Sequence, residues 1–152
     1  MRSLITTAIV AIACSLMQLP NAYAAEAGPP HRVAIHVDQN DLDVMNQALN
    51  NASNVMEYYR SRNEEVEVEI VTYGPGLHML RDDTSPMKDR IRGMAESSFP
   101  AKIKFAACNI TKQGMEKREG HVITIIPQAT IVPSGVVRLM ELQEKGWSYI
   151  RP

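Results

Sequence analysis

The 152-residue sequence predicts an α/β fold, with a five-stranded, mainly parallel sheet covered by helices on both faces as a three-layer α/β/α sandwich. Two observations predict it. Five short apolar segments alternate along the chain with four segments whose apolar residues recur at helical spacing. No internal repeat or low-complexity stretch interrupts this alternation. A chain that alternates in this way usually pairs its strands in parallel and packs the connecting helices on the sheet.

The first half supplies two strands and two helical regions. The first strand is expected at residues 31–37, and a helix is expected from Asp41, where apolar residues begin to recur every three or four positions. The second strand is expected at residues 66–73, stopped by Gly74-Pro75-Gly76. A broken helical region follows, and Ser85-Pro86 should restart it as N-cap and first helical residue. Its inward residues would be Met87, Ile91 and Met94.

The second half continues the pattern. A strand is expected at residues 101–108, and a helix at 110–118 is ended by Gly120. A loop over 120–128 leads to a strand at 129–132. Ser134 should then cap a helix that carries Val137, Met140 and Leu142 and ends at Gly146, before a short closing strand at 147–150.

Charged residues predict which strands are neighbours. Glu67 and Glu69 lie at the same distances from the end of their strand as Lys102 and Lys104 do from the end of theirs. If strands two and three are adjacent and parallel, the four charges share one face of the sheet and pair across it. Such a half-face is unusual in a buried parallel sheet, so either the helices leave it uncovered or another subunit covers it.

The N-terminus is typical of a secretory signal. Arg2 precedes an apolar run over residues 4–19, and Ala22-Tyr23-Ala24 is a small-x-small cleavage site. Residues 1–24 are therefore expected to be a signal peptide, residues 25–30 a flexible lead-in, and residues 31–152 one domain. Processing as a lipoprotein at Cys14 is the weaker alternative. The expected location is periplasmic or secreted, without a membrane anchor after cleavage.

Composition argues against several function classes. The net charge is −1 and no stretch combines basic with aromatic residues, so nucleic-acid binding has little support. The Gly74-Pro75-Gly76 turn lacks the spacing of nucleotide-binding loops. The methionines beyond the signal could favour a soft-metal site with Cys108, but they are scattered along helical faces, and core packing explains them better. We expect no metal and no cofactor.

Ligands of open parallel sheets bind beyond the carboxyl ends of the strands. The binding candidates at that edge are Asp38, Gly74, Gly76, Asn109 and Ser134. Each has a structural explanation as well, because aspartate, glycine and serine at such positions also shape turns and cap helices. His36 and His78 follow the first two strands and are either structural or functional.

Cys108 is the strongest catalytic candidate. It would be the only thiol left after signal cleavage, and it closes a strand directly before a helix. The positive end of a helix dipole favours a thiolate, so the pKa of this thiol should be lowered unless the site is sealed in apolar surroundings. A Cys-His hydrolase using His36 or His78 is a weaker alternative, because no nucleophile-elbow motif surrounds the cysteine. A small buried structural cysteine is the other alternative.

Four segments together resemble the DsrE/DsrF-like family, in its exported branch: HRVAIHVDQND, YGPGLHML, FAAC and VPSGVVRLMELQEKGWSYIRP. The resemblance covers about residues 31–152 and is most specific in the last segment. It implies a flavodoxin-like sandwich and homo-oligomers, commonly trimers or hexamers. In sulfur-relay members a cysteine after the third strand accepts sulfane sulfur as a persulfide, and Cys108 falls at the matching place.

The sequence thus leads to the hypothesis of an exported sulfur-binding or sulfur-carrier protein, with Cys108 as sulfur acceptor and with protein donors and acceptors of sulfur as partners. This is a carrier role more than enzymatic turnover. The alternative is a non-catalytic oligomeric ligand-binding or scaffold module in which the cysteine is structural.

Overall fold

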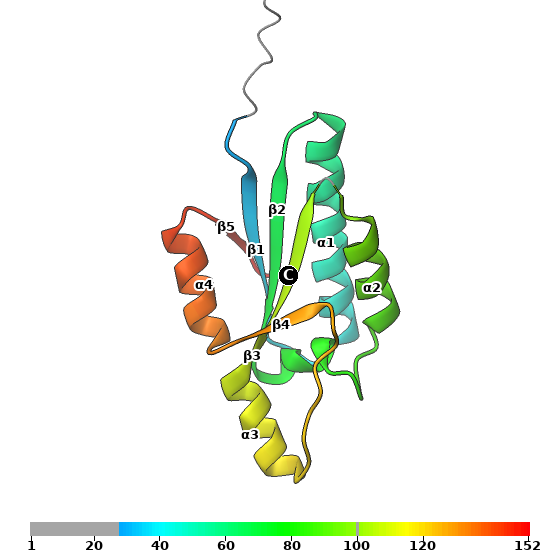
Figure 1. Cartoon of the computed structure of the whole chain (residues 1–152), viewed down its shortest axis with the longest axis vertical. Helices are drawn as coiled ribbons and strands as arrows, with labels where there is room; N and C mark the ends of the chain where they lie inside the picture. The colour runs from blue at the N-terminus through cyan, green and yellow to red at the C-terminus, as the bar shows by residue number, and fades with distance from the viewer. Residues whose placement is uncertain (1–27, 100) are drawn as a thin grey trace, which may run out of the picture.

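The computed structural model describes residues 28–99 and 101–152. The predicted signal peptide and the first residues of the lead-in lie outside this part. The five strands form one sheet in the order β4-β3-β2-β1-β5, and all four pairings are parallel (Figure 1). The strands are β1 (His31–Val37), β2 (Val66–Thr72), β3 (Lys102–Cys108), β4 (Ala129–Val132) and β5 (Ser148–Ile150).

Helices cover both faces of this sheet, so the predicted three-layer α/β/α sandwich is confirmed (Figure 1). The helices are α1 (Leu42–Ser61), the 3-10 helix η1 (Gly74–Leu80), α2 (Lys88–Ser97), α3 (Asn109–Glu119) and α4 (Gly135–Glu144). Helices α1 and α2 lie on one face, and α4 lies on the other. No helix in the described part of the chain is long and apolar enough to cross a membrane.

The strand order explains this division of the helices. From β1 to β4 each strand adds to the same side of the sheet, so right-handed crossovers place α1, α2 and α3 toward one face. The chain then returns across the sheet from β4 to β5, and the same handedness sends α4 to the opposite face. Met115 of α3 accordingly joins the core that α1 forms, whereas Leu139 and Leu142 of α4 form a second, smaller core.

The two cores differ in the residues that the strands supply. Toward α1 the strands present large aliphatic side chains such as Ile35 and Ile70, and Asp41 caps α1 by accepting from the backbone N–H of Asp43 at 2.8 Å. Toward α4 they present the small residues Ala34 and Ala106 with Val71. Small side chains let α4 pack close to the sheet.

The charge register of β2 and β3 is as predicted. Glu67 aligns with Lys102 and Glu69 with Lys104 in adjacent parallel strands. Lys104 Nζ lies 3.9 Å from Glu67 Oε2, a diagonal pair. Glu69 is buried and is held by Arg138 of α4, whose Nε and Nη2 donate to its two carboxylate oxygens at 2.6 and 2.7 Å. Helix α4 therefore covers one end of the charged half-face and leaves the lysines exposed.

One local expectation was wrong. Helix α2 begins at Lys88 and not at Pro86, because the Ser85 hydroxyl accepts from the Met87 N–H at 3.1 Å and closes a turn before the helix. In α4, Leu142 is buried, but Val137 and Met140 are exposed. The buried stripe of this short helix runs through Leu139 and Leu142, which lie three residues apart on one face.

Two glycines should respond in opposite directions to alanine. A Cβ on Gly76 would overlap the carbonyl oxygen of Val37 and lie 2.9 Å from the Cα of Asp38, whereas a Cβ on Gly93, inside α2, would meet nothing within 4 Å. Gly76→Ala should therefore lower the free energy of unfolding by about 1–3 kcal/mol. Gly93→Ala should raise it by about 0.5–1 kcal/mol, because alanine is the better helix former. Urea denaturation measures the free energy of unfolding of both variants. An unchanged free energy of unfolding in Gly76→Ala would contradict the close packing of η1 against β1.

Candidate functional site

The direction of the chain connections reverses where β3 and β4 end. These strands are neighbours, yet the helices that follow them leave toward opposite faces of the sheet. Open parallel sheets bind their ligands at such a reversal, beyond the carboxyl ends of the strands. Cys108 is the last residue of β3 and pairs in register with Val132, the last residue of β4. The fold therefore places the thiol at the reversal itself.

The starts of α3 and α4 both supply hydrogen-bond donors to Cys108. Cys108 is the N-cap residue of α3, and its Sγ accepts from the backbone N–H of Thr111 at 3.5 Å. The backbone N–H groups of Ile110 and Gly135 and the side chain of Thr111 also act on the sulfur. Burial raises the pKa of this thiol, but these donors outweigh burial, so the pKa of Cys108 is lowered from its ordinary value.

Gly135 allows α4 to come this close. A Cβ at Gly135 would lie 3.0 Å from the Cβ of Tyr73 and 3.2 Å from the Cβ of Cys108. Both distances are shorter than ordinary van der Waals contact between carbons. Only glycine at this first position of α4 lets the helix start rest on Tyr73 and aim its N–H at the sulfur.

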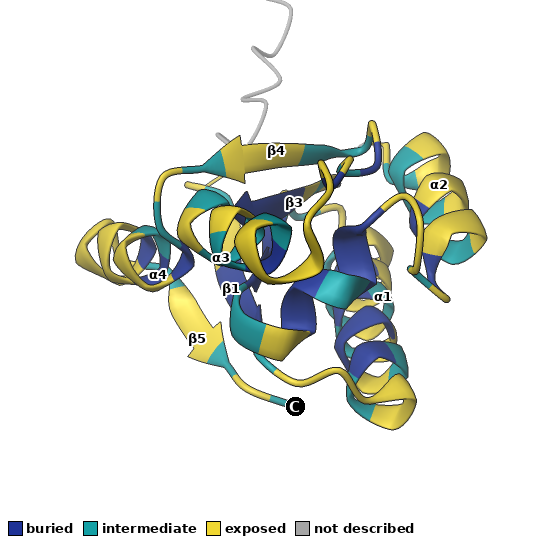
Figure 2. Cartoon of the chain, turned by 90° about the horizontal axis from the view of Figure 1, so that it is seen from below, coloured by how far each residue is buried: buried dark blue, intermediate teal, exposed yellow. Residues whose placement is uncertain are grey.

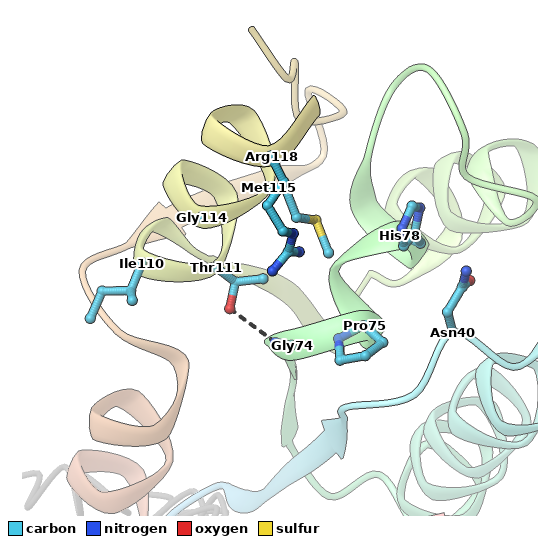
Figure 3. Close-up of a pocket in the computed structure, with 9 residues that line it drawn as sticks. All are labelled: Asn40, Gly74, Pro75, His78, Ile110, Thr111, Gly114, Met115 and Arg118. Atoms are coloured by element: carbon cyan, nitrogen blue, oxygen red, sulfur yellow. Dashed lines mark hydrogen bonds between the residues drawn. The ribbon is translucent and has the colours of Figure 1, made fainter. Parts of the chain in front are cut away.

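Thr111 is held in turn by Gly74, as Figure 3 shows. The Gly74 N–H donates to Thr111 Oγ1 at 2.9 Å, so the hydroxyl proton of Thr111 is free to point to Cys108. Gly74 adopts a φ of 52°, in the left-handed region that glycine enters without strain. The chain Gly74 N–H, Thr111 O–H, Cys108 sulfur is a short relay in which each donor is oriented by the one before it.

A second polar cluster lies on the same sheet face, on β1 and at the C-terminus. His36 is buried and stacks on Tyr73 with 4.5 Å between ring centroids, and its Nδ1 lies 2.8 Å from the Tyr149 hydroxyl. Burial, the largest influence, lowers the pKa of His36, which keeps the ring neutral near pH 7. Its Nε2 has no hydrogen-bond partner and lies 3.8 Å from Asp38, which Arg151 binds at 2.8 Å.

The predicted site residues therefore take different places. Asp38 is held in an ion pair with Arg151, and Gly76 packs under the end of β1. Gly74 acts through Thr111. Asn109 is the half-buried first residue of α3 beside the thiol. Ser134 is the N-cap of α4, but its side chain makes no capping hydrogen bond.

Sequence reasoning missed three neighbours of the thiol, namely Tyr73, Thr111 and Gly135. The position of Thr111, three residues after Cys108 at a helix start, was a usable signal because N-cap side chains receive their hydrogen bonds from that position. His78 lies elsewhere, with its Nδ1 2.9 Å from Thr84 Oγ1. Arg138, one turn into α4, is bound to Glu69.

Two facts limit the chemistry of this site. The Cys108 residue is only 4% exposed, so a reagent must be small or the start of α4 must move to reach the sulfur. Within residues 28–99 and 101–152, no three His, Cys, Asp or Glu side chains are grouped to hold a metal ion. The site therefore provides a buried thiol whose pKa is lowered by the Thr111 side chain and by nearby backbone N–H groups.

The chain matches no protein-family model and no curated protein. Among solved structures it is similar to a protein of unknown function, MTH1491 from Methanobacterium thermoautotrophicum, with 27% sequence identity and a TM-score of 0.65. The match covers 80% of this chain and 99% of that one. It supports the α/β/α sandwich as the fold of the chain.

Replacement of Thr111 tests the relay. Thr111→Val keeps the shape but removes the hydroxyl, so the pKa of Cys108 should rise relative to wild type. Thr111→Ser keeps the hydroxyl and should leave that pKa near its wild-type value. The ultraviolet absorbance of the thiolate against pH measures all three. Identical titrations of wild type and Thr111→Val would show that the hydroxyl has no part in stabilising the thiolate.

Proposed function

We propose that the protein is an exported sulfur carrier of the DsrE/DsrF-like kind, in which Cys108 holds sulfane sulfur as a persulfide. The single observation that carries the proposal is the set of donors on Cys108 from the starts of two helices. These donors favour an anion at the end of the cysteine side chain. Export rests on the N-terminal sequence pattern, and the sulfur chemistry rests on the family resemblance together with this geometry.

The chemistry requires no cofactor. The Cys108 thiolate attacks the terminal sulfur of a polysulfide and a new S–S bond forms. The S–S bond between that sulfur and the rest of the polysulfide breaks, and the remainder leaves as a dianion one sulfur shorter. The protein then carries Cys–S–S⁻. An acceptor thiolate attacks the outer sulfur, the S–S bond to Cys108 breaks, and the Cys108 thiolate is restored while the acceptor leaves as a persulfide. Charge and electrons balance in both steps.

Sulfur uptake tests this proposal. After treatment with inorganic polysulfide, intact-mass analysis should show about one added sulfur atom per chain, removable by a small thiol. Cys108→Ser should take up none. His36→Gln should take up sulfur as wild type does, because backbone donors and not a general base stabilise the thiolate. If polysulfide treatment gives the wild type no added mass that a small thiol removes, the carrier proposal is wrong.

A second function is favoured by one observation, the burial of Cys108. At 4% exposure the cysteine could serve as a small packing residue under α4, in a non-catalytic ligand-binding or scaffold module. Alkylation by iodoacetamide separates the two. The carrier must react in the folded state at a rate that follows the thiolate fraction, whereas a packing cysteine reacts only at the rate of unfolding.

We also propose that the protein is a homo-oligomer, which the resemblance implies as a trimer or hexamer. Support comes from four apolar side chains on β4 and α4 that are about half exposed: Ile131, Val136, Val137 and Met140. In Figure 2, which colours the chain by burial, β4 and the outer side of α4 are mostly exposed. Exposed apolar residues that gather on adjacent elements are typical of protein interfaces.

Light scattering tests the assembly. The wild type should show a mass of several chains at micromolar concentration, and Val137→Glu/Met140→Glu should show one chain, because charge on an interface core opposes association. Leu42→Glu is the matched control, since Leu42 is 54% exposed on the opposite side of the sheet and should leave the mass unchanged. A monomeric wild type would contradict the proposal.

A further inference from the structure

A cavity of about 360 Å³ lies between η1 and α3, on the side of α3 away from α4 (Figure 3). Pro75, Ile110 and Met115 give it an apolar wall. Three polar side chains from separate parts of the chain stand around it, namely Asn40, His78 and Arg118. An apolar cavity with a few convergent polar groups is the usual form of a small-molecule site.

The geometry of α3 builds one wall of this cavity. Thr111, Gly114 and Arg118 lie at intervals of three and four residues and therefore share one helix face. Side chains on a helix lean toward its N-terminus, and Figure 3 shows Arg118 running back along α3 toward Thr111. A Cβ on Gly114 would meet nothing within 4 Å, so the missing side chain leaves open space beneath the guanidinium.

Arg118 has no counterion among the described residues. Glu119 is bound to Arg81 at 2.7 Å and Glu116 to Lys112 at 2.6 Å, so the acids nearest in sequence are already paired. His78 uses Nδ1 toward Thr84, which leaves its Nε2 free. The cavity is thus lined by the uncompensated guanidinium of Arg118 and by the polar side chains of Asn40 and His78.

We propose that this cavity is a binding site for a small organic carboxylate with a short apolar body, a second site that shares Gly74 and Thr111 with the surroundings of Cys108 but is not lined by the thiol. The flat guanidinium of Arg118 matches the two oxygens of a carboxylate. A single cation suits a monoanion better than a doubly charged phosphate. The apolar wall accommodates a hydrocarbon chain, while Asn40 and His78 offer hydrogen bonds to the polar end.

Hexanoate is the probe for calorimetric titration of the protein, with hexanamide as its uncharged counterpart. Hexanoate should bind saturably at one site per chain and hexanamide at least tenfold more weakly, because the charge-assisted contact with Arg118 is lost. Cys108→Ser should bind hexanoate as wild type does, so this result is independent of sulfur transfer.

Two pairs of variants locate the site. Arg118→Gln should weaken hexanoate binding about tenfold or more, whereas Lys117→Gln removes the same charge one residue away, outside the cavity, and should leave it unchanged. Gly114→Leu should fill the cavity and abolish binding while the helix stays folded, and Gly93→Leu in α2 is its control. Absence of saturable binding to the wild type, equal affinity for hexanamide, or equal effects of the Arg118 and Lys117 variants would overturn the proposal.

Discussion

The packing of α4 on the sheet determines which groups surround the Cys108 thiol. One turn into this helix, Arg138 binds both oxygens of the buried Glu69, and its first residue, Gly135, packs between Tyr73 and Cys108. A buried ion pair of this kind adds little net stability, because the loss of hydration offsets much of the attraction. The ion pair instead positions the helix. Arg138 can donate to both oxygens of Glu69 in only one orientation, and that orientation fixes the height and rotation of α4 on the sheet. The backbone N–H of Gly135 is then among the groups that lower the pKa of Cys108.

The fold could be predicted from the sequence because its signals are local. The run of residues 31–37 predicted both bounds of β1, and the helical spacing that follows Asp41 predicted the start of α1 to the residue. The register of β2 and β3 was also predictable, because a shift in register would separate Glu67 and Glu69 from the lysines that align with them on β3. The start of α2 was missed since Ser85 is a capping residue in both a turn and a helix, and only its contact with Met87 decides between them.

The site was predicted in position but not in its interactions. That Cys108 ends β3 and starts α3 follows from the chain itself, and the helix start alone argued for a lowered thiol pKa. The other contacts come from residues that are distant in sequence. Gly74, after β2, donates to Thr111, and Gly135, at the start of α4, acts on the sulfur. Such contacts arise from the crossover that returns α4 across the sheet, and no local pattern encodes them. For the same reason the ion pair between Arg138 of α4 and Glu69 of β2 could not be predicted from the sequence.

The same packing both buries Cys108 and surrounds its sulfur with donors. Burial raises the pKa of the thiol, and the donors lower it. The starts of α3 and α4 supply donors only because they lie within hydrogen-bonding reach of the sulfur, and at that reach they also exclude solvent. In a persulfide the negative charge moves to the outer sulfur, about 2 Å beyond Sγ, and so away from the position that the donors now surround. The outer sulfur therefore needs an opening beside the thiol, and movement of the start of α4 would provide it, since Cys108 is only 4% exposed. A thin sulfur chain fits such an opening with a smaller displacement of α4 than a bulky disulfide does. If Cys108 carries sulfur as we propose, narrow donors would be favoured over wide ones, and the Arg138–Glu69 pair would restrain the movement of α4.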